Sequence, residues 1–347
     1  MTRKIMVPQF TARPNSVDKI GLDLRIKGRY RRGIIILGSG QLAANIAAHL
    51  KKTSSARYQF VGWLGAEHTQ GFTTNSFKSL KEIVAQGCVS SVVVALSERR
   101  GVFPTEELLT CRKKGIRVED GVAFYEKLSG KIPLAGLNPS SLIFSDGFKR
   151  LTFTMICKRL IDVLASCIGL MLSLPVWGLL ALAVKLDTPG PVLFRQKRLG
   201  QDEKRFQLLK FRTMRWEPHS SGDSRWAGEK DQRLTRVGKV IRRWRFDELP
   251  QLWNVLKGDL SFVGPRPDVP ALRDTLKGGV PYYSLRTAIK PGITGWAQVR
   301  YHYVSSVQEG IERHEYDLYY IKNMSLLLDL RIIIETFKIV ILGRGAR

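Results

Sequence analysis

Two adjacent acids, Asp247 and Glu248, lie in the stretch "RWRFDELPQLWNVLKG" of a chain whose formal net charge is +26. Two ionised carboxylates can hold Mg²⁺, and one of them can instead attack phosphorus, as carboxylates do when they form acyl phosphates. Pro250 predicts the first turn of a helix, where its missing N–H needs no partner. The dipole of that helix and the nearby Arg242 favour the ionised form of both acids. The pair is therefore a candidate site for phosphoryl-transfer chemistry.

A simpler interpretation is that Asp247 only caps the helix by accepting hydrogen bonds from its first N–H groups. Capping leaves the neighbouring Glu248 unexplained. A strand-like segment, "FQLLKFRTM", adds Lys210 and Arg212, which can share one face of a strand because side chains two residues apart point the same way. Taken singly, each cation is as easily a solvated surface residue. Beside paired acids they predict contacts with phosphate oxygens, for which arginine offers a planar fork and lysine a compact charge.

Composition limits the class of partner. The 347 residues are 44% apolar and 25% charged, which is enough for two folded domains. Residues 195–245 contain sixteen Lys or Arg and six Asp or Glu. Such an excess of positive charge predicts an anionic partner, which can be nucleic acid, phospholipid headgroups or a phosphorylated substrate. The four cysteines show no CxxC pairing and no histidine at metal-ligand spacing, which argues against a disulfide framework or zinc and favours the cytosol.

The first half of the chain has the pattern of an α/β domain. Residues 1–32 form a basic tail without the apolar core of a signal peptide, and residues 33–130 alternate strands with helices, which predicts a parallel, Rossmann-like sheet. Strands are expected after the first glycine of this domain and at 58–64, 90–96 and 115–120, and helices at 78–86 and 104–114. Gly38, Gly40 and Ala43 match G-x-G-x-x-A, a turn that lets a phosphate approach a helix N-terminus. The second strand ends without the acid of a dinucleotide site, so a purely structural turn is favoured over nucleotide binding.

A linker at 131–157 leads to residues 163–184, which contain no charged residue. As a helix this segment would measure about 33 Å, matching the ~30 Å hydrocarbon core of a bilayer. Basic residues flank it on both sides, beginning with Lys158 and Arg159, and the positive-inside tendency favours both ends in the cytosol. Pro175 at its centre can bend the helix. These features predict a re-entrant hairpin that breaks at the proline; a straight span and a buried soluble helix are the alternatives.

Asp162 follows Lys158 by four residues and Arg159 by three, which is the spacing of neighbours on one helix face. This spacing predicts an ion pair that anchors the hairpin at the membrane interface. The alternative is a solvated acid in the first turn.

Ordered motifs run through the second half of the chain, from about residue 158 to 345. They are the Lys-Arg pair with Asp162, the apolar segment with its proline, "PGPVLFRQKRLG", "KFRTM", "DELPQLWNVLKGDLSFVGPRP", "KPGITGWAQV" and "YDLYYIKN". This series resembles the bacterial sugar transferases known as monotopic phosphoglycosyl transferases. The whole chain resembles their longer, exopolysaccharide-initiating members, which carry an N-terminal nucleotide-binding-like domain. It departs from them in that a basic tail, and not several transmembrane helices, precedes Gly33, and Leu174 replaces the serine that shorter relatives have before the proline.

The resemblance implies transfer of a sugar-1-phosphate from a nucleotide diphosphate sugar to polyprenyl phosphate, with release of a nucleoside monophosphate. It implies that Asp247 is the nucleophile, that Glu248 helps to hold Mg²⁺, and that Arg242, Arg266 and Asp317 belong to the active site. The expected architecture is a Rossmann-like α/β domain plus a mainly α, membrane-inserted catalytic domain over residues 158–347. The expected location is the cytoplasmic face of the bacterial inner membrane, with a phospholipid bilayer as partner and a homo-oligomer as a further possibility.

Two other classes of protein fit part of the sequence. A nucleic-acid-binding protein would account for the net charge and the aromatic residues, but it gives no reason for the uncharged segment at 163–184. An NAD-dependent nucleotide-sugar oxidoreductase would use the G-x-G-x-x-A turn, but the ribose-binding acid is missing. The transferase explains both halves of the pattern, and nucleic acid is not expected as a partner.

Overall fold

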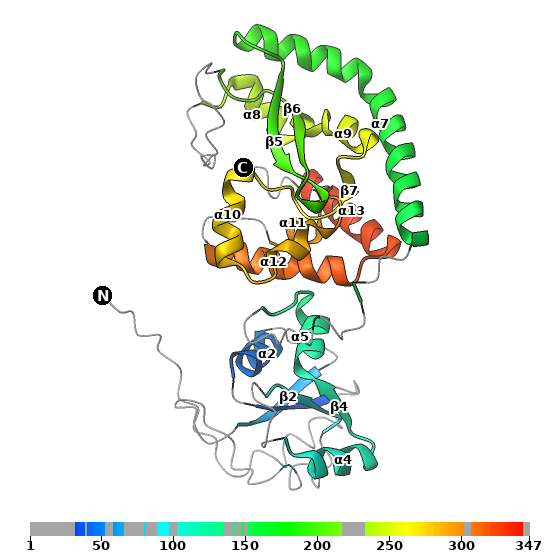
Figure 1. Cartoon of the computed structure of the whole chain (residues 1–347), viewed down its shortest axis with the longest axis vertical. Coiled ribbons are helices and arrows are strands. Elements are labelled where there is room, and N and C mark those ends of the chain that lie inside the picture. The colour runs from blue at the N-terminus through cyan, green and yellow to red at the C-terminus, as the bar shows by residue number, and fades with distance from the viewer. Residues whose placement is uncertain are drawn as a thin grey trace, which may run out of the picture. The chain divides into compact units, whose positions relative to one another are not determined.

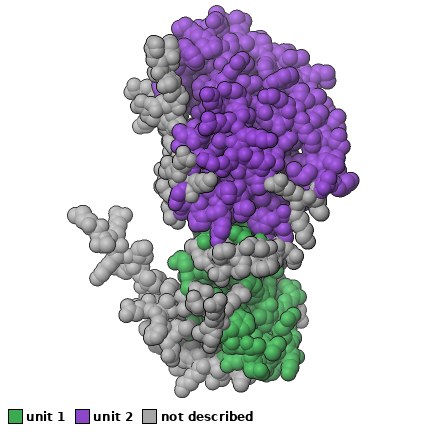
Figure 2. Space-filling model, in the orientation of Figure 1, with its two compact units in different colours: residues 1–144 green, residues 145–347 purple. Residues whose placement is uncertain are grey.

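The computed structural model of the protein describes residues 32–38, 40–52, 58–65, 80, 89–96, 103–134, 142, 147–148, 152–216, 233–301 and 307–342. The basic tail predicted at 1–32 and the helix predicted at 78–86 lie outside the described residues, apart from positions 32 and 80. The chain divides into two compact units, Met1–Phe144 and Ser145–Arg347, which Figure 2 colours separately.

The N-terminal unit contains a four-stranded parallel sheet with the order β2-β1-β3-β4. The strands are β1 Arg32–Leu37, β2 Tyr58–Leu64, β3 Ser91–Val94 and β4 Arg117–Asp120; the helices are α2 Gln41–Lys52, α4 Thr105–Lys113 and α5 Gly121–Ser129. Ile34 and Ile36 of β1 pack with α2 and α5, whereas Ile35 packs with Leu108 and Cys111 of α4. Because successive side chains of a strand point to opposite faces, helices cover both faces of the sheet. The predicted parallel α/β architecture is confirmed.

The G-x-G turn at the end of β1 has a structural reason for its first glycine. Gly38 has φ +136°, and a Cβ atom there would lie 2.3 Å from the carbonyl oxygen of Ala95, just past β3. Its N–H donates to the Leu64 carbonyl at 2.8 Å, and its own carbonyl accepts a hydrogen bond from the Trp63 indole. These contacts explain the turn without a ligand. They agree with the favoured interpretation of a structural turn, and they leave the alternative of nucleotide binding at Gly38, Gly40 and Ala43 untested.

The C-terminal unit is mainly helical and begins with α7 Thr152–Asp187, a single helix of 36 residues. Its other elements are β5 Leu193–Leu199, η1 Gln201–Glu203, β6 Arg205–Phe211, α8 Arg236–Arg243, η2 Phe246–Glu248, α9 Gln251–Lys257, β7 Ser261–Val263, α10 Pro270–Gly279, η3 Tyr283–Ala288, β8 Gly292–Thr294, α11 Trp296–Arg300, α12 Val307–Lys322 and α13 Leu326–Ile341. Strands β5 and β6 form an antiparallel hairpin, and β7 pairs with β8 in parallel.

Helix α7 is continuous through Pro175, so the predicted break at this residue is wrong. Proline removes one backbone hydrogen bond and can bend a helix without ending it. Figure 1 shows α7 as one curved helix, and it contacts α8, α9, β6 and β7. Its apolar residues, such as Leu164, Leu172 and Leu179, are mostly exposed, and only 11% of its most apolar window is buried. The alternative of a buried soluble helix is therefore also wrong.

The start of α7 is joined to the rest of the unit by three polar side chains. Lys158 pairs with Asp329 of α13 at 2.5 Å, and Arg159 donates to the carbonyls of Val255 and Leu256 at the end of α9. Asp162 is buried and accepts the backbone N–H of Phe262 in β7 at 3.0 Å. The predicted ion pair of Asp162 with its basic neighbours is wrong, as is the solvated alternative, because all three side chains have partners on other elements.

The loop at residues 264–267, which follows β7, lies against residues 290–292, which lead into β8. A Cβ atom on Gly264 would lie 2.5 Å from the Lys290 carbonyl oxygen, and one on Gly292 would lie 2.1 Å from the Gly264 nitrogen. Larger residues would force the strands β7 and β8 apart at this point. The close approach fixes the loop that follows Gly264 and carries Arg266.

Candidate active site

The paired acids lie in η2, the short turn between α8 and α9. Helix α8 ends at Arg243, and Arg245 then adopts a left-handed conformation, with φ 58°, that redirects the chain. Helix α9 begins right after its N-cap, Pro250, and no side chain of the N-cap residue caps it by a hydrogen bond. The predicted position of the acids just before a helix is confirmed. The alternative that Asp247 caps this helix is wrong.

Lys210 of β6 lies between the two acids. Its Nζ atom is 3.0 Å from Glu248 Oε1 and 3.8 Å from Asp247 Oδ2. Asn254 of α9 fixes the strand at this place, because its Oδ1 accepts the Leu209 N–H at 3.1 Å and its Nδ2 donates to the Gln207 carbonyl at 2.7 Å. Lys210 therefore lies at the acids, and its contact with substrate phosphate stays a prediction.

Arg212 does not lie with Lys210, and its predicted contact with phosphate is wrong. It is buried and donates to three carbonyl groups at and after the end of α7, those of Val184, Thr188 and Pro189, at 2.6–3.0 Å. Strand β6 ends one residue earlier, at Phe211, so the strand alternation does not extend to Arg212. Its role in this structure is to hold the C-terminal end of α7.

Two further cations predicted for the site act on the acids electrostatically. The charge of Arg242 favours ionisation of Asp247, and its Nε donates to Thr213 Oγ1 at 2.9 Å. Arg266 is close enough to both acids for mutual electrostatic effects, the stronger one with Glu248. The structure thus brings Arg242 and Arg266, from different elements, to the same acid pair.

The pKa values of the two acids shift in opposite directions. Burial raises the pKa of Glu248, but Lys210, then Arg266 and Arg245, outweigh it and lower the pKa to about 2. Burial raises the pKa of Asp247 and the negative charge of Glu248 adds to this, against the opposing effect of Lys210. The expectation that both acids are favoured in the ionised form holds for Glu248 and is wrong in direction for Asp247, because burial exceeds the effect of the nearby cations.

The acids also fit a divalent cation. Asp247 Oδ1 is buried without a hydrogen-bond partner among the described residues. Mg²⁺ is commonly held by one or two carboxylates together with substrate phosphates and water. Asp247 and Glu248 supply such carboxylates, and across the part of the chain that the structure describes no cluster of three or more His, Cys, Asp or Glu forms a more complete site.

Asp317 lies behind the Arg266 loop, in a buried ionic network. Arg286 donates from Nε to Asp317 Oδ2 at 2.7 Å and from Nη2 to the Arg266 carbonyl at 2.7 Å, and it also pairs with Asp268. Arg313 donates to the same carbonyl of Arg266 at 3.3 Å. Asp317 therefore contacts Arg286, which supports the loop from which Arg266 extends. Sequence reasoning missed Arg286, since "YYSLRTAIK" carries no pattern that marks its arginine.

A buried histidine beside this network makes stability depend on pH. Burial and then the charge of Arg286 lower the pKa of His314 to about 4 from 6.5. His314 therefore takes up a proton at a lower pH in the folded state than in the unfolded chain. Its contribution to the free energy of unfolding is fully present above pH 6.5 and is lost as the pH falls toward 4. We expect this loss to reach about 3 kcal/mol. Unfolding in detergent between pH 4 and 7 should be less pH-dependent for His314→Phe than for the wild type; equal slopes would contradict the prediction.

The protein combines an α/β unit with a mainly helical unit. The helical unit contains a long apolar helix and a pair of acids surrounded by cations. The bacterial sugar transferase family matches residues 153–343, more than half of the chain. The chain belongs to this family, in the form with an additional N-terminal region, as its resemblance implied.

Three relatives show which proteins the chain is similar to. The chain is 44% identical over 190 residues to the UDP-N-acetylgalactosamine-undecaprenyl-phosphate N-acetylgalactosaminephosphotransferase of Aeromonas hydrophila. This match covers 55% of this chain and 45% of the relative. It is 32% identical over 330 residues to the undecaprenyl-phosphate glucose phosphotransferase of Komagataeibacter xylinus, covering 92% and 60%. It is 44% identical over 186 residues to the UDP-glucose:undecaprenyl-phosphate glucose-1-phosphate transferase of Caulobacter vibrioides, covering 52% and 67%. The chain thus matches between about half and two thirds of these relatives' lengths.

Proposed function

We propose that this protein transfers a sugar-1-phosphate from a nucleotide diphosphate sugar to polyprenyl phosphate and releases a nucleoside monophosphate, as the first membrane step of exopolysaccharide or related glycan assembly. The observation that carries the proposal is the contact of Lys210 with both Asp247 and Glu248, inside the half of the chain that matches the family. The names of the relatives support undecaprenyl phosphate as the acceptor and a UDP-sugar as the donor. The family match favours this activity over the oxidoreductase and nucleic-acid alternatives.

In the first step, a carboxylate oxygen of Asp247 attacks the phosphorus that carries the sugar. The bond from this phosphorus to the bridging oxygen breaks, and the nucleoside monophosphate leaves with the bonding electrons. Lys210, Arg242 and Arg266 lie where they can stabilise negative charge on the transferring group and on the leaving phosphate. The product is a phosphosugar bound covalently to Asp247.

In the second step, a phosphate oxygen of polyprenyl phosphate attacks the same phosphorus. The bond to Asp247 breaks, the carboxylate is regenerated, and the lipid diphosphate sugar is released. Glu248 stays ionised during both steps because of its low pKa. Bound Mg²⁺, held by Asp247 and Glu248 with the substrate phosphates, would supply charge neutralisation of the transferring group.

The proposal is tested by a donor screen with purified protein, undecaprenyl phosphate and Mg²⁺. We expect release of UMP with UDP-glucose or UDP-N-acetylgalactosamine, together with the lipid product. Chelation by EDTA should stop the release, and addition of Mg²⁺ should restore it. Absence of nucleoside monophosphate with every nucleotide sugar would refute the proposal.

We also propose that α7 inserts as a re-entrant helix from the cytoplasmic face of the inner membrane. Its uncharged residues 163–184 would extend about 33 Å if straight, enough to cross a hydrocarbon core of ~30 Å, but the helix is curved (Figure 1). Basic residues flank it on both sides. Single cysteines at positions 33 and 345 of a cysteine-free variant should be labelled from the same side of inverted vesicles. Labelling from opposite sides would establish a straight span.

A further inference from the structure

One arginine beside the acids occupies a backbone position that suits glycine. Arg245 has φ 58° and ψ 19°, in the left-handed region that follows the last residues of a helix, and its N–H donates to the Arg242 carbonyl at 3.1 Å. Glycine is the usual residue at such a position, because a side chain there is strained. The chain keeps an arginine at this point, which suggests that the side chain has a use that offsets the strain.

Arg245 is more exposed than Lys210, which also pairs with Glu248. Its side chain is 40% exposed, against 19% for Lys210, and its Nη1 atom is 3.7 Å from Glu248 Oε1. Its charge also acts on Asp247 and on Arg266. The side chain of Arg245 thus lies within the field of the acid pair and is partly exposed, so that a second anionic substrate can reach it.

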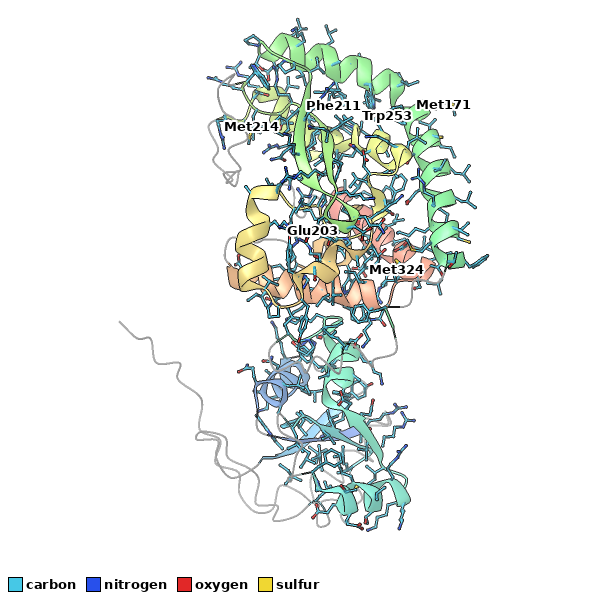
Figure 3. The ribbon with its side chains drawn as sticks, viewed as in Figure 1. Met171, Glu203, Phe211, Met214, Trp253 and Met324 are labelled. Carbon is cyan, nitrogen blue, oxygen red and sulfur yellow. The ribbon has the colours of Figure 1, made fainter. Side chains whose placement is uncertain are left out.

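Exposed aromatic side chains flank Arg245 along the chain and recur on α9. Trp244 and Phe246, the two neighbours of Arg245, are 51% and 39% exposed, and Trp253 of α9 is 53% exposed. The residue before it, Leu252, packs against Gly169 of α7, with its Cδ1 atom 3.1 Å from the place of a Cβ. Figure 3 shows Trp253 on α9 and the exposed Met171 on α7 in the same part of the unit. Exposed aromatic residues are therefore the chain neighbours of Arg245 and also lie on α9, the helix that contacts α7.

The geometry points to Arg245 as the residue that binds the phosphate of the lipid acceptor, with Trp244, Phe246 and Trp253 contacting its prenyl chain. A polyprenyl phosphate has an anionic head and a long apolar tail, and this surface offers a guanidinium next to aromatic side chains. Its head at Arg245 would lie next to Asp247, where the phosphosugar is held. The inference rests on the proposed function and identifies the acceptor side of the same site.

Arg245→Gly is the decisive variant, because it relieves the backbone and removes only the side chain. We expect its melting temperature in detergent to equal or exceed that of the wild type, and its KM for undecaprenyl phosphate to rise roughly tenfold. The rate at which radiolabelled donor labels the protein without acceptor should fall less than turnover at low acceptor concentration, and its fall measures the part of the effect that runs through the ion pair with Glu248. Arg243→Ala, which removes the same charge from an exposed neighbour in α8, is the matched control and should leave the KM for the acceptor unchanged.

A binding measurement makes the test independent of turnover. Quenching of tryptophan fluorescence by farnesyl phosphate should show a roughly tenfold weaker Kd for Arg245→Gly, whereas farnesol should bind both proteins alike. Trp253→Ala should weaken binding of farnesol and of farnesyl phosphate to a similar degree. The inference is overturned if Arg245→Gly binds farnesyl phosphate as tightly as the wild type, or if it slows labelling by donor as much as overall turnover. Lack of nucleoside monophosphate release by the wild type would refute the proposed function, and the binding result would still decide the role of Arg245.

Discussion

Replacing Asp247 with asparagine is expected to abolish both turnover and the covalent phosphosugar-enzyme. An amide is a poor nucleophile, so the first step loses its attacking group, and we expect kcat to fall by at least roughly 10³-fold. The substitution keeps the size of the side chain and its place beside Lys210, whose Nζ atom is 3.8 Å from Asp247 Oδ2. The measurement is incubation with radiolabelled UDP-sugar and no acceptor, followed by detection of label on the denatured protein.

Glu248→Gln is the matched control for this experiment. The adjacent acid has a low pKa and supports the metal in the proposed mechanism, so its loss should weaken the Mg²⁺ dependence and the rate while leaving slow labelling of the protein. Label on Asp247→Asn at wild-type levels would rule out the assignment and favour direct transfer in a single displacement.

The raised pKa of Asp247 adds a pH dependence to the same step. Attack requires the ionised carboxylate, and burial shifts its pKa upward from 3.8. Labelling of the wild type should therefore decline, as the pH falls, at a higher pH than for an ordinary aspartate. This decline reports on the covalent first step, and it is distinct from the loss of folding stability at low pH that is expected from His314.

Local sequence features predicted the elements that depend on neighbouring residues. The aliphatic run of β1 specifies a buried strand, the segment of β2 specifies a partly buried one, and Pro250 specifies where the helix after the acids begins. The acids themselves were identified because two carboxylates are unusual in a basic region. In each case the signal and its cause lie within a few residues of each other.

Features that depend on tertiary contacts were not predictable in this way. Arg212 was expected beside Lys210 from strand alternation, but the carbonyl groups after α7 bind its guanidinium. Asp162 was expected to pair within its own helix, but its partner is a backbone N–H 100 residues away. A buried polar group takes whichever partner the fold brings close, and spacing along the chain does not reveal that partner.

Arg286→Met is expected to cause the largest loss of stability among the changes considered. Arg286 is buried and joins Asp317, Asp268 and the Arg266 carbonyl. Its removal leaves two carboxylates buried without their main cation, and such a change lowers the free energy of unfolding by roughly 3–5 kcal/mol. For a unit of this size the melting temperature in detergent should fall by on the order of 10 °C.

The activity of Arg286→Met should fall by more than the loss of folded protein explains. The Arg266 carbonyl loses a hydrogen bond from Arg286, so the loop that places Arg266 near the acids becomes less fixed, and the KM for the donor should rise even at temperatures where the variant is folded. Arg286→Lys should restore little, because one ammonium group cannot reproduce the planar fork that contacts two carboxylates and a carbonyl.

Arg273→Met provides the matched control, because the side chains of the Arg273–Glu203 pair are 30% and 27% exposed, against 6% and 2% for Arg286 and Asp317, and ion pairs contribute less as their exposure increases. Its melting temperature and KM should stay close to those of the wild type. If Arg286→Met and Arg273→Met lose equal stability, the buried network is not what holds the Arg266 loop. If Arg286→Met is strongly destabilised but keeps the wild-type KM for the donor when folded, the network stabilises the unit without positioning Arg266. Only a combined loss of stability and donor affinity, specific to Arg286, supports the view that Asp317 acts on the site through this arginine.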